Sequence, residues 1–338
     1  MFGKMMNSFY YGKSGKGDFR KEDLPTNRWQ LFWEMLRVRI AGLMRLNLMS
    51  LVAWLPLIIA IGSFVSTVFN VLVISGDYEN YLQTGEMGNL VEAQIEALKG
   101  IDLQDFQMNT FYQAMSTMLV WMIPAILITG PIQAGMAYVT RNWARDEHAF
   151  VWSDFKDAVK ENWKQALGVS AITSVLPIVI YICFQFYGDM AADNTFFVLP
   201  QMLVIMLGLV WALGLTFMYP MMVSYKMSFK ELVKNSILMA VAKLPMTVAL
   251  RLAMLLPALI CLVVFYFTGA LLAFLVLAAY YVFLGYALTR FVFASFTNAV
   301  FDKYINSRIE GVEINRGLAS EDDDEDDEEL EAAEKTQE

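Results

Sequence analysis

Residues 47–74 read NLMSLVAWLPLIIAIGSFVSTVFNVLVI and contain no Asp, Glu, Lys, Arg or His. About 20 consecutive apolar residues are enough to cross the hydrocarbon core of a bilayer as an α-helix. The run is too long for the apolar region of a cleavable signal peptide, and the residues before it are polar and basic. It therefore predicts a first membrane-spanning helix that stays in the membrane as an anchor.

Five further apolar runs of this kind follow, at residues 112–138, 166–188, 196–222, 246–268 and 271–297. Hydrophobic residues make up 57% of the chain and charged residues 17%, whereas about a quarter of the residues of a soluble domain are charged. The sequence therefore predicts an all-α integral membrane protein with six transmembrane helices.

The basic residues predict the orientation of these helices. Residues 1–46, 139–165 and 223–245 hold nine, five and four Lys and Arg, whereas the acidic segment 75–111 holds only Lys99. Positively charged loops remain on the cytoplasmic side during insertion. Both termini are therefore expected in the cytoplasm, with inner loops at 139–165 and 223–245 and an outer acidic loop at 75–111.

The chain divides into three parts by composition: a polar N-terminal segment (1–27), a six-helix membrane domain (28–305) and a tail (306–338). Residues 310–338 carry 14 acids and 2 bases, including the run EDDDEDDEE at 321–329. Such a run repels itself and favours disorder. The tail is therefore predicted to be a disordered, acidic cytoplasmic segment, and the rest of the chain has a net charge of +3.

A pattern repeats in the first, third and fifth spans, each of which contains a Leu-Pro pair with Pro56, Pro177 or Pro257. An amphipathic stretch precedes each span, and two of these stretches, FKDAVK (155–160) and FKELVK (229–234), nearly coincide. Basic amphipathic helices lie in the headgroup layer of a membrane, and a proline kinks a span. We interpret the pattern as a threefold repeat of an interfacial helix, a kinked span and a plain return span.

Ionisable residues are scarce within the six runs, which contain no Asp, Glu, Lys or His. Proton relays and many ion-coupled sites use such residues inside the membrane. His148 is the one histidine of the chain, and both cysteines, Cys183 and Cys261, lie in apolar runs. No catalytic residue, metal site or cofactor is therefore predicted, and no nucleic-acid motif is present.

Arg251 and Arg290 are the charged exceptions inside the apolar runs. Arg251 falls in the first turns of an outward span and Arg290 in the last turns of an inward span, so both are expected at the same inner depth. Two interpretations remain open. The side chains either reach to the headgroups, or together contact an anionic lipid or substrate headgroup.

The stretch GPIQAG (130–135) closes the second span with small residues that permit close helix packing, and it includes Pro131 as a further candidate kink. A hinge or gate at this place is the alternative. The stretch RDEHAF (145–150) follows. We interpret it as a turn between the span and an amphipathic helix, and as part of a partner-docking loop. Its candidate residues are Arg141, Arg145, Asp146, Glu147, Trp152, Asp154 and Phe155.

The stretch GPIQAGMAYVTRNWARDEHAFVWSDFKDAVKENWKQA (130–166) resembles the YesL-like family of bacterial six-span membrane proteins of unknown function. RLNLMSLVAWLPLIIAIG (45–62) is similar to the first span of that family. The resemblance extends over roughly 40–305, and the long N-terminal region, the acidic outer loop and the acidic tail depart from typical members.

The resemblance implies a location in the bacterial cell membrane and a role accessory to carbohydrate transport or utilisation, beside a sugar transporter or sensor complex. It supplies no catalytic residues. A transporter or channel for an uncharged or lipid-like solute is the second hypothesis. The lipid bilayer is the one partner that the residues themselves predict, and the sequence indicates no oligomeric state.

Overall fold

The computed structural model describes residues 25–269 and 272–319, which contain helices and no strand. Six helical segments in this part of the chain are long and apolar enough to cross a membrane. They are α2 (Arg28–Thr84), α4 (Leu103–Trp143), α5 (Ser153–Asp193), α6 (Val198–Ser224) with η2 (Thr195–Phe197) before it, α8 (Leu244–Thr268), and α9 (Leu272–Tyr280) continued through η3 (Tyr281–Gly285) and α10 (Tyr286–Tyr304). The predicted all-α class and the six spans are confirmed, and the chain is a multi-pass membrane protein.

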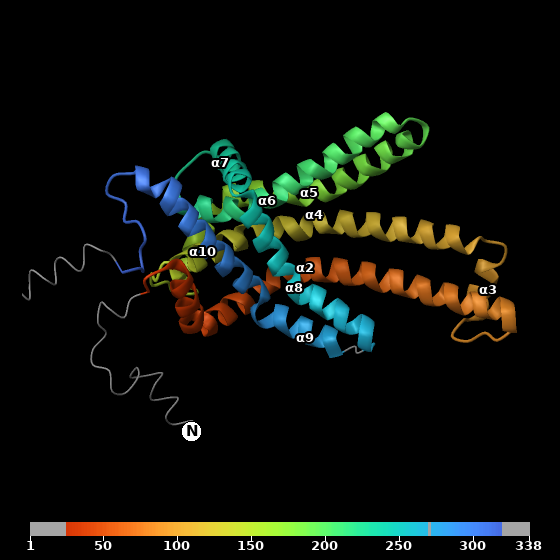
Figure 1. Ribbon diagram of the computed structural model, residues 1–338. Coiled ribbons are helices and arrows are strands. Elements are labelled where there is room, and N and C mark those ends of the chain that lie inside the picture. The colour runs from red at the N-terminus through yellow and green to blue at the C-terminus, as the bar shows by residue number, and fades with distance from the viewer. Residues whose placement is uncertain (1–24, 270–271, 320–338) are drawn as a thin grey trace, which may run out of the picture.

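The six spans form three helical pairs that spread apart from one end of the molecule (Figure 1). The pairs are α2 with α4, α5 with α6, and α8 with α9. At their common end lie α10 and the short helix α7 (Phe229–Ala242). Both ends of the described chain meet there, since the backbone N–H of Ala319 donates to the carbonyl of Pro25 at 3.1 Å. We call this end the base and the opposite end the far end.

The buried core of the molecule lies mainly at the base. One cluster joins the start of α2 to the last turns of α4 through Leu31, Leu43 and Trp143, and a second surrounds Phe217 and Phe301. In contrast, apolar side chains of the diverging halves are exposed, among them Val52, Phe69, Leu207 and Tyr266. In a bilayer such surfaces contact lipid tails or another membrane protein, so the base alone holds the three pairs together.

Close packing at the second span is confirmed. A Cβ atom on Gly130 would lie 2.3 Å from Ser170 Oγ and 2.5 Å from the backbone oxygen of Ala166, so only glycine lets α4 approach α5 this closely. Gly135 likewise faces the ring of Phe155, 2.7 Å from where its Cβ would stand.

Two of the three predicted interfacial helices do not stand apart from their spans. α2 continues without a break from Arg28 through Pro56, and α5 continues from Ser153 through Pro177. Only α7 is separate: it ends at Ala242, and Pro245, which has no backbone N–H to continue the hydrogen bonds of α7, lies in the first turn of α8. Whether Pro56, Pro131, Pro177 and Pro257 kink their helices, and whether the three units repeat, stay predictions.

The acidic segment 75–111 contains a helix, and the start of the tail is more ordered than the sequence predicts. α2 extends to Thr84, α3 (Glu92–Leu98) follows, and Leu90 and Leu98 pack on Tyr78 in a small core at the far end. Beyond α10, η4 (Asn306–Arg308) and the segment 309–319 fold back over the base. The acidic run 321–329 and the first 24 residues lie outside the described part of the chain.

Candidate functional site

The loop 144–152, between α4 and α5, is held rigidly at the base. Arg145 is buried, and its Nε lies 3.1 Å from a carboxylate oxygen of Glu147. The indole N–H of Trp143 donates to the carbonyl of Ala149 at 3.3 Å, and the backbone N–H of Glu147 donates to the carbonyl of Asn142 at 2.8 Å. These contacts fix the path of the loop, whereas the side chains of Asp146, His148, Phe150 and Trp152 are exposed.

The segment 309–319, which we call the strap, crosses this loop. Arg316 reaches Glu147 at 3.4 Å and Glu313 at 3.5 Å, and Arg145 donates to the carbonyl of Glu313 at 3.3 Å. Gly317 has a left-handed φ of +82°, and a Cβ there would meet the backbone oxygen of Arg145 at 3.1 Å. The glycine therefore allows the strap to lie directly on the loop.

An ion pair at the base anchors the strap. Arg28, at the start of α2, contacts the buried carboxylate of Asp302 in α10. The same carboxylate accepts from the backbone N–H of Asn315 at 3.2 Å and from the side chain of Asn306 at 2.6 Å. One buried acid thus joins the first helix, the last helix and the strap.

A polar cavity of about 510 Å³ lies between the strap, the loop and the ends of α4, α6 and α10. Its charged lining consists of Arg141, Arg145, Glu147, Glu313 and Arg316. We call it the base cavity. The sequence predicted Arg141, Arg145 and Glu147 as neighbours, but Arg316 came from the segment that it assigned to a disordered tail.

Tyr225 adds a neutral hydrogen-bonding group to the base cavity. Burial raises the pKa of its phenol to about 12, although Arg141 and other neighbours partly oppose this. The hydroxyl donates to Asn306 Oδ1 at 2.7 Å. The phenol therefore stays protonated at neutral pH and brings no negative charge to the cavity.

The other predicted docking residues divide into exposed and buried groups. Trp152 is 64% exposed and Asp146 is exposed, whereas Phe155 is buried against α4 and therefore is not part of any docking surface. Asp154 accepts a hydrogen bond from the backbone N–H of Phe150 at 2.8 Å, at the start of α5. Its carboxylate thus orders the end of the loop.

Arg251 and Arg290 both contact α6, at Thr216 and Tyr219, three residues apart. Arg290 donates to the side-chain oxygen of Gln133 and lies 5.0 Å from the ring centre of Tyr219. Arg251 donates to Thr216 Oγ1 at 3.0 Å and lies 5.3 Å from the ring centre of Phe293. The sequence placed both arginines at one depth but did not identify these partners, which come from α4, α6 and α10.

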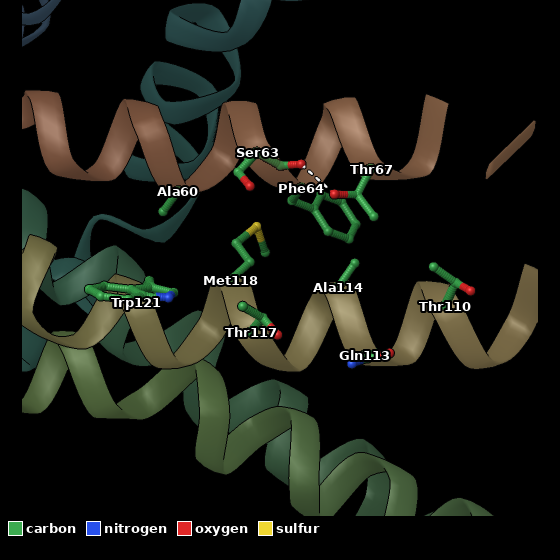
Figure 2. A pocket seen from close by; sticks show the side chains of 10 residues that line it. All are labelled: Ala60, Ser63, Phe64, Thr67, Thr110, Gln113, Ala114, Thr117, Met118 and Trp121. Carbon is green, nitrogen blue, oxygen red and sulfur yellow. Dashed lines mark hydrogen bonds between the residues drawn. The ribbon is translucent and has the colours of Figure 1, made fainter. Parts of the chain in front are cut away.

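A second pocket, of about 360 Å³, separates α2 from α4 between the base and the far end (Figure 2). Ser63 and Thr67 line it from α2, and Thr110, Gln113 and Thr117 from α4, with Trp121 at one end. We call it the α2–α4 pocket. It places hydroxyl and amide groups among apolar helices, a feature that sequence reasoning missed because these residues are spread over two spans.

Residues 111–184 match a family model described as a protein of unknown function, DUF624. The matched residues run from α4 through the loop 144–152 into α5. Comparison with curated proteins and with solved structures found no match.

Proposed function

We propose that this chain is a YesL-like, non-enzymatic protein of the bacterial cell membrane that docks a carbohydrate transporter or sensor. Both termini and the base lie on the cytoplasmic side in this proposal, since basic residues concentrate in the segments at the base. The family match over residues 111–184 supports this proposal, because the matched residues include the loop 144–152.

The observation that carries the proposal is the structure of the loop 144–152. The side chains of Phe150 and Trp152 are 65% and 64% exposed, although the buried side chains of Trp143 and Arg145 hold the loop in place. Large exposed aromatic side chains on a rigid support are typical centres of protein interfaces, because little conformational entropy is lost when they bind. The loop is therefore the docking surface, and the apolar sides of the diverging helices offer additional contact within the membrane.

Site-specific photo-crosslinking in intact cells tests this proposal. A photoreactive residue at position 150 should crosslink to a subunit of a membrane transporter or sensor. Position 82 is the matched control, since Leu82 is 64% exposed but lies at the far end of α2. Trp152→Ala should reduce the crosslink at position 150. Crosslinks from position 150 to lipid alone would contradict the proposal.

A transporter or channel for an uncharged or lipid-like solute is the second candidate, and the α2–α4 pocket favours it. Ser63, Gln113 and Thr117 line that pocket, and their side chains form no hydrogen bond with the residues that the structure describes. Polar groups without partners are costly within a membrane. A polar solute that passes along the pocket would satisfy them.

Reconstituted vesicles test the second candidate with a panel of uncharged sugars and fluorescent lipids. The double variant Ser63→Ala, Thr117→Val should lose transport. Ser66→Ala is the control, because Ser66 is exposed and outside the pocket lining. A wild-type protein that moves none of these solutes would rule out this function.

A further inference from the structure

The base cavity holds one arginine, Arg141, that forms no ion pair with the residues that the structure describes. Arg141 lies in the last turn of α4 and is partly buried. Its guanidinium makes one hydrogen bond, to Asn142 Oδ1 at 3.1 Å, and forms no ion pair with the described residues. A guanidinium carries five N–H donors, so most of its donor capacity is unused.

The two acids that line the base cavity are already engaged by other arginines. Glu147 lies 3.1 Å from Arg145 and 3.4 Å from Arg316, and Glu313 lies 3.5 Å from Arg316. Three arginines therefore share two carboxylates. The excess positive charge falls on Arg141, which faces the open space of the cavity.

The uncharged part of the lining suits an anion as well. Tyr225 remains protonated at neutral pH, and the side chain of Asn298 donates to the carbonyl of Arg141 at 3.1 Å, which holds the end of α4 in place. A partly buried cation without a counter-charge is costly. An anion bound beside Arg141 would remove that cost and complete its hydrogen bonds.

We propose that the base cavity binds a phosphate group, with Arg141 as the principal contact and Arg145 beside it. A guanidinium matches the oxygens of a phosphate in a two-bond geometry. The volume of about 510 Å³ lies within the usual range for small-molecule sites, so the phosphate can belong to a phosphorylated small molecule. The phosphate of an anionic lipid headgroup presents the same chemistry at the membrane surface. The site is independent of the docking role proposed above.

Calorimetric titration of the full-length protein with inorganic phosphate, in nanodiscs of phosphatidylcholine, tests the site. Arg141→Gln should weaken phosphate binding about tenfold or more, since a hydrogen bond to a charged group is lost. Arg37→Gln removes the same charge from an exposed position on α2 and should bind as the wild type does.

Nanodiscs that also contain phosphatidylglycerol distinguish the two sources of the phosphate. If the lipid headgroup occupies the cavity, phosphatidylglycerol should abolish the binding of inorganic phosphate by the wild type. Arg141→Gln weakens the site for both ligands, so its weak phosphate binding should be the same in the two kinds of nanodisc. If a soluble phosphate compound is the ligand, the wild-type titrations should agree. Either result supports the site.

Two results would overturn the proposal. One is the absence of phosphate binding by the wild type in phosphatidylcholine nanodiscs, and the other is equal binding by the wild type and Arg141→Gln. If Arg141→Gln does not yield a monodisperse protein, Arg141→Lys decides instead. It keeps the charge but loses the planar fork, so we expect an intermediate Kd, and an unchanged Kd would exclude the proposed contact.

Discussion

Asn47, buried in α2, accepts a hydrogen bond from the backbone N–H of Ala287 at 2.9 Å, across 240 residues of chain. Its amide nitrogen donates to the carbonyls of Tyr281 and Val282, at 2.9 and 2.6 Å. These carbonyls belong to η3, a π-helical turn in which the regular i to i−4 hydrogen bonds are interrupted. One side chain of the first span therefore satisfies the backbone of the last.

Asn47→Ala should lower the thermal stability of the protein in detergent, because it leaves backbone groups buried without partners. Each such group costs about 1–3 kcal/mol. Asn70→Ala provides the control, since Asn70 lies exposed on the same helix. Thermal unfolding followed by tryptophan fluorescence measures both, and equal midpoints for the two variants would contradict the role of Asn47.

Asp302→Ala should release the strap from the base. The carboxylate holds Arg28 and the backbone of Asn315, and loss of this partly buried ion pair is expected to cost about 1–3 kcal/mol. Limited trypsin digestion should then cleave faster after Arg308 and Arg316. Glu310→Ala changes the same charge at an exposed position nearby and should leave the cleavage rate unchanged.

The same ion pair can be tested by combining substitutions. Arg28→Ala should accelerate trypsin cleavage on its own but add little to Asp302→Ala, since residues that share one interaction act non-additively. Fully additive effects would show that the two side chains act separately.

Gly130→Ala should destabilise the packing of α4 on α5, because its Cβ would stand 2.5 Å from the backbone oxygen of Ala166. Overpacking of this kind costs about 1–3 kcal/mol. Gly62→Ala is a matched change in α2, where nothing lies within 4 Å. It should be neutral or slightly stabilising, since alanine favours helix more than glycine does. Thermal unfolding in detergent compares the two, and a Gly130→Ala midpoint at or above that of Gly62→Ala would contradict the close approach.

The start of α7 should depend on pH. Ser228 hydrogen-bonds to the carboxylate of Glu231 through its backbone N–H and its hydroxyl, and these bonds lower the pKa of Glu231 below its usual value of 4.5. A lowered pKa in the folded state means that the stabilisation is present above pH 4.5 and is lost as the pH falls through the folded-state pKa. Glu231→Gln removes the titrating group and should therefore unfold at a lower temperature than the wild type at pH 7, with the difference shrinking below pH 4.5. A difference that is constant with pH would exclude this linkage.

The candidate site could be predicted only in part. Arg141, Arg145 and Glu147 are close in sequence, on a helix end and the turn after it, so local pattern was enough to group them. Tyr225, Asn298 and Arg316 complete the base cavity from three other segments. Nothing in their own surroundings in the sequence marks them, because their contacts depend on how α6, α10 and the strap cross the end of α4.

Hydropathy alone determined that this chain crosses the membrane six times as helices, because a backbone in lipid must satisfy its own hydrogen bonds and only long apolar helical runs do so. The tertiary structure decided that the helix pairs meet at one end, that Asn47 completes a distant turn, and that residues 306–319 return to the base. These features rest on contacts between residues far apart in the chain. Their energies depend on helix crossing and side-chain fit, which the periodicity of a single segment does not contain.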